Sequence, residues 1–214
     1  VNPNKVFVSY CFIASNEMND IKLYDSNSKK YIDTDDGRVA IKEPYFMSVS
    51  TLQPGKNFEG LIKAFSLFHS KFPNYKLYIV GKKGWRYDTI FVGLKNSEVK
   101  SNIIITGYIS DEDVHLLYEK CEGVVFVSFC EGFGYSPLEG FYHNKTCVAS
   151  KVSSIPEVVG KAGIYVNPYD IKSIAQGMEE LITHQSVYIQ YIPEQIEKFD
   201  PQILISKFIK TLIQ

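Results

Sequence analysis

The segment GVVFVSFCEGFGYSPLE, from Gly123 to Glu139, decides how this chain folds. The run Gly123–Ser128 is apolar, which is typical of a strand buried inside a parallel sheet. A glycine-rich turn follows, and the chain continues in a helical pattern over Pro137–Asn144. Ser136 and Pro137 suit the N-cap and the first position of that helix. The segment therefore predicts a strand, a turn and a helix of an α/β protein.

Two carboxylates, Glu131 and Glu139, flank this turn. Gly132 and Gly134 allow a sharp bend and leave room for a ligand beside the main chain. The start of a helix is also a ready site for an anion, because its first amides face outward. Amides for an anion and carboxylates for hydroxyl groups are what a nucleotide sugar requires. The alternative is a plain turn with two solvated glutamates.

From Tyr45 onward, apolar runs alternate with amphipathic segments, which is typical of a parallel α/β sheet. We expect strands at Tyr45–Ser50, Tyr75–Val80, Asn102–Thr106, Gly123–Ser128, Thr146–Ala149 and Gly163–Val166. Between them we expect helices at Phe58–Phe72, Trp85–Lys95, Asp111–Lys120, Pro137–Asn144 and Asp170–His184, and a short helix within Val152–Gly160. A doubly wound sheet of about six strands follows, with ligands at the carboxyl ends of the strands.

The two ends of the chain differ from this pattern. Lys5–Tyr10 has the composition of a lone strand, and the polar stretch Ser15–Gly37 resembles a linker or surface excursion. Asp200–Gln214 is an amphipathic helix, with Ile203, Leu204, Phe208 and Leu212 on one side. We therefore divide the chain into a linker remnant (1–44), a Rossmann-like domain (45–199) and a C-terminal helix (200–214).

Composition narrows the class of protein. The chain has 214 residues, 45% of them hydrophobic and 22% charged, as in an ordinary globular protein. A net charge of −1 gives no electrostatic case for nucleic acid. No signal peptide and no apolar run of about 20 residues is visible. The scattered cysteines indicate reduced thiols in a cytoplasmic protein, and the four histidines lack the spacing of metal ligands.

The loop after the first expected strand, Thr51–Asn57, carries a candidate phosphate ligand. Pro54 and Gly55 form a tight turn, and Asn57 is placed to cap the next helix. Lys56 then lies at the carboxyl edge of the sheet, where an ammonium would neutralise charge on a leaving phosphate. The alternative is a solvated loop lysine.

Three further positions end strands at the same edge. Lys82 is either a second phosphate ligand or an exposed turn residue, and Trp85 is expected to be buried against a helix. Tyr108 either stacks on a nucleobase or packs within the protein. Ser153 or Ser154 is expected to cap the short helix that contains Glu157.

The motif EGFGYSPLE resembles the glutamate–seven residues–glutamate motif of retaining glycosyltransferases with the two-domain GT-B architecture, and most closely those of family 4. TLQPGKN, VGKKGW, TGYISDEDVHLLYEKC, EGFGYSPLEGF, ASKVSSIPEVVGKAG and VNPYD follow in the order and spacing of that family. Together they cover roughly residues 45–184. The resemblance implies that this chain is the C-terminal, donor-binding half of a GT-B fold.

Carried over by position, the resemblance assigns roles to residues of this chain. Glu139 would bind the ribose hydroxyls, and Glu131 and Lys56 would lie by the donor sugar and the diphosphate. The remaining substrate-binding positions are Gly132, Phe133, Gly134, Tyr135, Ser136 and Lys82, with Tyr108 and Ile109 beside the base. Transfer in this family usually needs no metal.

The chain departs from the family pattern in three places. Ser50 stands where glycine is frequent, and Val127 stands where proline is frequent. Gly55 stands where arginine commonly precedes the lysine, so one phosphate-binding cation is absent from its usual place. Lys82 or Lys83 is a candidate to replace it.

The resemblance thus implies transfer of a hexosyl group, for instance mannosyl, from a UDP- or GDP-sugar to a glycan or lipid-linked acceptor of a bacterial surface polysaccharide. It also implies a missing N-terminal acceptor domain, so that this half alone has little activity, and it allows peripheral attachment to a membrane. Two alternatives remain. A non-catalytic nucleotide-sugar-binding module or partner subunit would bind nucleotide without transfer, and an unrelated flavodoxin-like domain would not bind nucleoside diphosphates.

Overall fold

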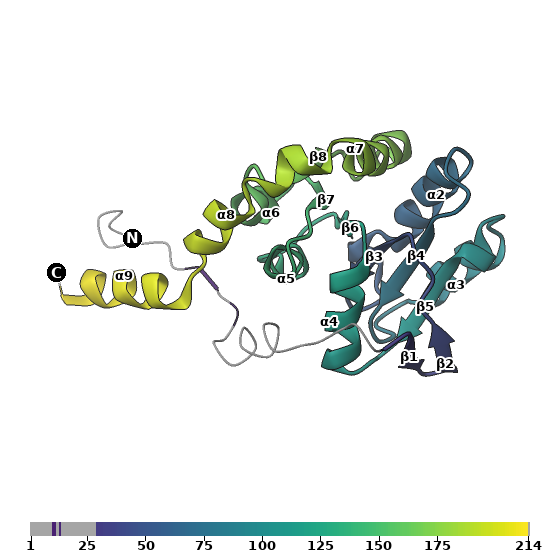
Figure 1. Cartoon of the computed structure of the whole chain (residues 1–214), viewed down its shortest axis with the longest axis horizontal. Helices are drawn as coiled ribbons and strands as arrows, with labels where there is room; N and C mark the ends of the chain where they lie inside the picture. The colour runs from purple at the N-terminus through teal and green to yellow at the C-terminus, as the bar shows by residue number, and fades with distance from the viewer. Residues whose placement is uncertain (1–9, 12, 14–28, 214) are drawn as a thin grey trace.

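The computed structural model describes residues 10, 11, 13 and 29–213 (Figure 1). Most of this part is built on a six-stranded parallel sheet, with the strand order β5-β4-β3-β6-β7-β8. Its strands are β3 (Tyr45–Val49), β4 (Lys76–Val80), β5 (Ile103–Gly107), β6 (Gly123–Phe126), β7 (Cys147–Ser150) and β8 (Gly163–Val166). The chain starts in the middle of the sheet, runs to one side and then returns to the other. This confirms the doubly wound, Rossmann-like sheet predicted from the sequence.

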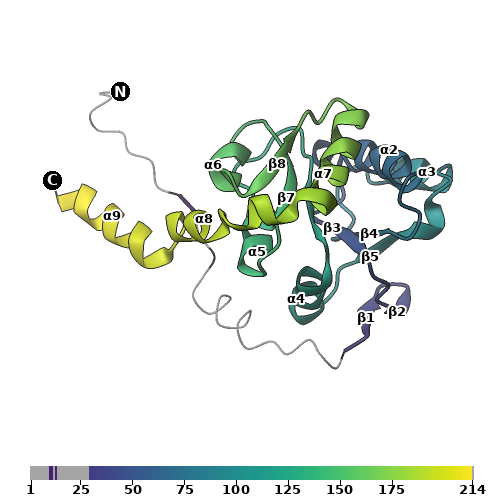
Figure 2. The same ribbon diagram turned by 45° about the horizontal axis from the view of Figure 1, so that its top comes forward.

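Helices cover both faces of the sheet (Figures 1 and 2). The α-helices are α2 (Phe58–His69), α3 (Asp88–Lys95), α4 (Asp111–Lys120), α5 (Tyr135–Tyr142), α6 (Ile155–Val159), α7 (Ile171–Ile189), α8 (Ile192–Lys198) and α9 (Pro201–Ile213). Short 3-10 turns, η2 (Pro54–Lys56) and η3 (Lys100–Asn102), precede α2 and β5.

Alternation along the strands builds one hydrophobic core on each face. In β3, Tyr45 and Met47 point into the core shared with α4, α5 and α6, whereas Phe46 points into the core shared with α2, α3 and α7. Successive side chains of a strand point to opposite faces, so a strand buried on both sides is apolar throughout. This is why the strands appear in the sequence as continuous apolar runs.

An antiparallel hairpin, β1 (Tyr31–Thr34) with β2 (Gly37–Ala40), precedes the sheet. It is attached to the domain: Ile32 is fully buried, and the Asp33 amide donates to Asp113 Oδ2 at 3.2 Å. The described part of the predicted linker or surface excursion thus belongs to a hairpin that packs on the domain, and one buried apolar side chain in a four-residue strand is too weak a pattern to reveal this in the sequence. Residues 5–9 of the expected lone strand lie outside the described residues.

Several expected boundaries shift. Helix α5 begins two residues before Pro137, and α3 begins three residues after Trp85. Helix α7 continues to Ile189 across a kink at His184, and α8 was not expected. Strands end within two residues of the predicted positions. The division of the chain into three segments stays a prediction.

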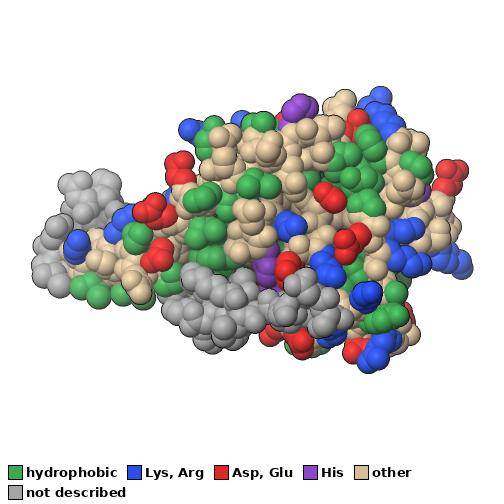
Figure 3. Space-filling model, viewed as in Figure 1, with side chains coloured by type: hydrophobic (Ala, Val, Ile, Leu, Met, Phe, Trp, Pro, Cys, Tyr) green, Lys and Arg blue, Asp and Glu red, His purple; other side chains and the backbone are tan. Residues whose placement is uncertain are grey.

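The expected C-terminal helix is present as α9, which extends away from the sheet (Figures 1 and 2). Leu204 is buried, whereas Ile205 and Ile209 are about half exposed, at 47% and 49%. Hydrophobic side chains line one edge of this helix in Figure 3. The Leu212 side chain lies outside the described part. In the portion of the chain that the structure describes, none of the helices combines the length and the apolar character needed to cross a membrane.

Candidate functional site

The candidate site lies where the strand order reverses, between β3 and β6. Ligands of doubly wound sheets bind at this switch point, outside the carboxyl ends of the strands. Lys56 follows β3 and Glu131 follows β6, and the two side chains meet there. The Lys56 ammonium donates to both Glu131 carboxylate oxygens, at 2.7 and 2.8 Å. Their side chains are only 18% and 11% exposed. The structure thus brings together the two residues assigned to the reacting end of the site.

Asn57 holds the loop that carries Lys56. Its amide nitrogen donates to the carbonyl oxygens of Val127 (3.1 Å) and Pro168 (2.8 Å), so it links the loops after β3, β6 and β8. Its backbone is left-handed (φ 58°), a conformation that asparagine tolerates better than most residues. A side chain on Gly60 would collide with the Asn57 amide, since an added Cβ would lie 2.3 Å from Oδ1. Asn57 is therefore a clamp between loops rather than the side-chain cap predicted for α2.

The main chain around Glu131 is fixed by two serines that precede α6. The Ser153 hydroxyl accepts from the Glu131 amide at 2.9 Å. The Ser154 hydroxyl donates toward the carbonyl oxygens of Glu131 and Phe133, both at 2.9 Å. Ser154 occupies the N-cap position of α6 without a side-chain capping bond. These serines hold the glycine-rich turn, whereas the sequence predicted that one of them caps the helix.

The turn itself leads into α5 through Gly134, which is the N-cap residue and has a positive φ of 135°. Gly132 has no such backbone, and an added Cβ there would meet nothing within 4 Å. Gly132 lies in a bend, as predicted, and has open space at its Cβ position, whereas only Gly134 needs the positive φ. The amides of Gly134 and Ser136 lie in the first turn, where an α-helix supplies no acceptor of its own. This places the expected anion-binding helix start beside Glu131.

Glu139 lies on α5 and is held by a buried tyrosine of α4. The Tyr118 hydroxyl donates to Glu139 Oε2 at 2.6 Å and lies 3.1 Å from the Ser136 hydroxyl. Tyr118 is completely buried. Burial, followed by the nearby Glu139 charge, raises the Tyr118 pKa well above its usual value, so the phenol keeps its proton. Ser136 is thus a buried partner of Tyr118 and not the predicted N-cap.

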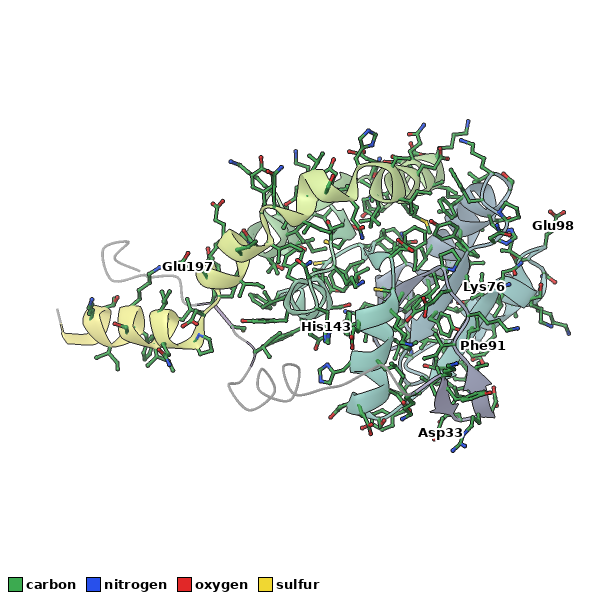
Figure 4. The ribbon with its side chains drawn as sticks, viewed as in Figure 1. Asp33, Lys76, Phe91, Glu98, His143 and Glu197 are labelled. Carbon is green, nitrogen blue, oxygen red and sulfur yellow. The ribbon has the colours of Figure 1, made fainter. Side chains whose placement is uncertain are left out.

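A pair of histidines lies behind this network, between α4 and α5 (Figure 4). The His143 ring stacks on Tyr118 with an interplanar angle of 9° and a centroid distance of 5.3 Å. His143 Nε2 lies 3.1 Å from His115 Nδ1. Burial lowers the pKa of His143 to about 4, with further contributions from His115 and Lys145. His143 is therefore neutral at physiological pH.

This shift predicts acid sensitivity of the domain. The pKa of His143 in the folded chain lies below the ordinary value of 6.5. Between pH 6.5 and about 4, His143 is therefore protonated in the unfolded chain and neutral in the folded chain, so that acid favours unfolding. Lowering the pH from 7 to 5 should remove about 2 kcal/mol of unfolding free energy through this group. Urea unfolding of the chain and of His143→Gln measures it. The variant should lose less stability over the same range; an identical loss in both would contradict the expectation.

The other predicted residues are spread along the same edge. Lys82 is exposed, and its carbonyl oxygen accepts from the Leu52 amide at 2.9 Å. Tyr108 is 67% exposed after β5, whereas Ile109 is buried. Trp85 is 69% exposed, so its predicted burial is wrong. It lies in the turn before α3, and the Arg86 guanidinium lies 5.3 Å from its ring centroid.

Sequence reasoning missed the roles of four contributors to this site. The helical pattern gives Tyr118 no role beyond its helix, and the sequence predicts that Asn57, and either Ser153 or Ser154, caps a helix. A tyrosine on the buried side of an amphipathic helix was the available signal for Tyr118, because a buried phenol needs a hydrogen-bond partner. The partner itself could not be read from the sequence, since it lies on another helix.

Comparison with known proteins identifies the family of this chain. The sequence profile of the family "Glycosyl transferases group 1" matches residues 32–198, which is more than half of the chain. The O-antigen chain mannosyltransferase B of Escherichia coli is 35% identical over 132 residues, which is 61% of this chain. The chain spans only 35% of that relative's length.

Solved structures show the same fold at low sequence identity. A glycosyltransferase from Rickettsia africae superposes with a TM-score of 0.71 at 17% identity, over 92% of this chain and 51% of its own. A structure described as trehalose-6-phosphate from E. coli bound with UDP-2-fluoro glucose gives 0.69 at 15% identity, over 80% of this chain and 44% of its own. These likenesses confirm the Rossmann-like fold expected from the sequence.

Proposed function

This chain belongs to the group 1 glycosyl transferases, and from that premise we propose that its carboxyl edge binds a nucleotide-sugar donor for transfer of a hexosyl group. The observation that supports this proposal is the ion pair between Lys56 and Glu131, which lies across the switch point and beside the start of α5. A cation and helix amides suit a diphosphate. Two carboxylates on the same turn and helix suit hydroxyl groups of the sugar and the ribose.

In the reaction we propose, the bond between the anomeric carbon and the phosphate oxygen breaks, and the nucleoside diphosphate leaves with the electron pair. The acceptor hydroxyl passes its proton to an oxygen of the leaving diphosphate and forms the new glycosidic bond with the anomeric configuration retained. Lys56 and the first amides of α5 stabilise the charge that develops on the leaving diphosphate. Glu131 binds the donor sugar, Glu139 binds the ribose, and the exposed Tyr108 borders the base.

The Lys56–Glu131 contact has a consequence for donor binding. In the described structure the ammonium is already paired with a carboxylate, and both groups are largely shielded from water. A donor phosphate must therefore either share the Lys56 ammonium with Glu131 or displace the Glu131 carboxylate from it. An added Cβ at Gly55 would meet nothing within 4 Å, so the structure has room for an arginine side chain there. The second cation is therefore absent because the residue is glycine and not because space is lacking. Lys56 carries the phosphate contact in our proposal.

We propose a mannosyl donor and a surface-polysaccharide acceptor because the E. coli relative is called an O-antigen chain mannosyltransferase. The acceptor is expected to bind mainly to a preceding N-terminal domain. The half-exposed Ile205 and Ile209 of α9 provide an apolar surface for contact with such a domain. Little activity of this half alone, a cytoplasmic location and peripheral membrane attachment stay predictions from the resemblance.

Calorimetric titration with UDP and GDP, with and without magnesium, tests the donor site. We expect one of the two to bind, independently of the metal. Glu139→Ala should weaken that binding by roughly 10- to 100-fold, because it removes charged hydrogen bonds to ribose hydroxyls. Glu98→Ala is the control, since Glu98 is exposed and lies at the other end of the domain (Figure 4). Binding of neither nucleotide would refute the donor site, and unchanged affinity in Glu139→Ala would refute the role of Glu139.

A further inference from the structure

The network around Glu139 contains a residue that the proposed function has not used. Tyr118 reaches Glu139 from α4, and its hydroxyl lies 2.6 Å from Oε2. This distance is that of a hydrogen bond between a neutral hydroxyl and an ionised carboxylate. Tyr118 is fully buried, whereas Glu139 is only partly buried. Tyr118 therefore contacts the carboxylate from the protein side and is not itself placed to touch a ligand.

The phenol has one hydrogen, and Glu139 Oε2 at 2.6 Å is a closer acceptor for it than the Ser136 carbonyl oxygen at 3.3 Å. The Ser136 hydroxyl, 3.1 Å away, can donate to the phenol oxygen and leave the phenol hydrogen for the carboxylate. Ser136 itself is buried, with 5% of its surface exposed. Serine, tyrosine and carboxylate then form a chain of hydrogen bonds in which each bond polarises the next.

The tyrosine ring is equally restrained. His143 stacks on it nearly in parallel, and His143 is paired with His115 of α4. His143 and Glu139 are joined along α5, where the His143 amide lies 3.3 Å from the Glu139 carbonyl oxygen. The same two helices thus hold the ring, the hydroxyl and the carboxylate. The hydrogen bond from Tyr118 thus restrains the rotation of the Glu139 side chain.

We propose that Tyr118 is a positioning residue for ribose recognition, because its buried hydroxyl holds the Glu139 carboxylate in the orientation that accepts the ribose hydroxyls of the donor. This inference rests on the proposed function, in which Glu139 binds the ribose. A preorganised carboxylate binds a hydroxyl without first losing rotational freedom. A site built for a hydroxyl group also rejects an analogue that lacks it, since its own polar group is then left unpaired.

The test compares affinities for the preferred nucleoside diphosphate and for its 2′-deoxy and 3′-deoxy forms by calorimetry. We expect the unmodified chain to prefer the ribonucleotide. Tyr118→Phe should lower the affinity for the ribonucleotide by roughly 10-fold and leave the affinities for the deoxy forms nearly unchanged. Most of the preference for the ribonucleotide over the deoxy forms is then lost. If the role of Tyr118 were purely structural, the variant would lower the affinities for all three nucleotides equally, and the ratios between these affinities would not change.

Tyr45→Phe is the matched control. Tyr45 is also fully buried, and its hydroxyl donates to the Leu117 carbonyl oxygen at 2.8 Å, one residue before Tyr118. This variant loses one buried tyrosine hydrogen bond to α4 without touching Glu139, so it should keep the ribose preference. Unfolding of both variants by urea shows whether their losses of stability are comparable.

The outcomes separate the two proposals. If the unmodified chain binds no nucleoside diphosphate, the proposed function fails. If it binds and prefers ribose, but Tyr118→Phe keeps the full preference, the role of Tyr118 is refuted and the donor site stands. Should Tyr118→Phe not fold, Ser136→Ala carries the same comparison, because it removes the donor that orients the phenol. If Ser136→Ala has a smaller preference for the ribonucleotide over the deoxy forms, the result supports the proposal. An unchanged preference refutes it.

Discussion

Replacing Lys56 by methionine is expected to lower sugar transfer by roughly 100- to 1,000-fold, the range found when one preorganised partner of a developing negative charge is removed. Methionine keeps much of the length of the lysine side chain but has no charge. The loss should be largest in kcat/KM, because Lys56 acts on charge that grows as the diphosphate leaves. Affinity for the free nucleoside diphosphate should fall as well. Because this half alone is predicted to have little activity, steady-state kinetics with donor and acceptor use a protein that also carries the proposed N-terminal domain, and calorimetry measures the affinity for the nucleoside diphosphate.

Lys71→Met is the matched control for this experiment. Lys71 also pairs with both oxygens of a glutamate, Glu179, at 2.7 and 3.0 Å, but its side chain is 61% exposed. The pair joins the turn after α2 to α7 and does not include the turn that carries Glu131. A surface pair of this kind contributes at most about 1 kcal/mol, so its loss should leave transfer unchanged. Near-normal transfer by Lys56→Met would refute the assignment of Lys56.

Replacing Asn57 by alanine is expected to lower the unfolding free energy by about 2–4 kcal/mol. The change leaves the carbonyl oxygens of Val127 and Pro168 without the amide that both accept, and it places alanine in a left-handed backbone. The loop that carries Lys56 should also lose its attachment to the loops after β6 and β8. Urea unfolding measures the first effect, and affinity for the nucleoside diphosphate measures the second.

Two further variants separate the causes. Asn57→Gly removes the same hydrogen bonds without the left-handed strain, so it should retain part of the stability that alanine loses. Asn144→Ala imposes the strain without those bonds, since Asn144 has a φ of 56° but is exposed. We expect a loss of about 1 kcal/mol there. If Asn57→Ala costs no more than Asn144→Ala, Asn57 does not act as a clamp.

The regular part of the fold could be predicted because its signals are local. Each parallel strand is buried on both faces, so Gly123–Phe126 and Cys147–Ser150 appear as short apolar runs that need no knowledge of their neighbours. Helix α4 begins at Asp111 as predicted, because Ser110 accepts from the Asp113 amide in a local cap. The chain order of these elements then fixes which loops share the carboxyl edge. Lys56 and Glu131 were placed at that edge for this reason.

What the sequence could not determine were bonds between residues far apart in the chain. Asn57 and Ser154 are of residue types that are preferred at helix N-caps, yet their side chains donate to carbonyl oxygens on other loops. Trp85 has the hydrophobicity of a core residue, yet its turn leaves it on the surface. Propensity describes what a residue prefers locally, and tertiary packing decides which partner it finds.

The sequence by itself thus determined the sheet, its order of elements and the carboxylates and lysine at one edge, because periodicity and turn chemistry act over a few residues. Only the tertiary structure decided that Lys56 pairs with Glu131, that Asn57 joins three loops and that Tyr118 holds Glu139. These contacts span between 21 and 111 residues of the chain. The physical reason is that a buried polar group must find a partner in space, and the packing of the helices on the sheet supplies it.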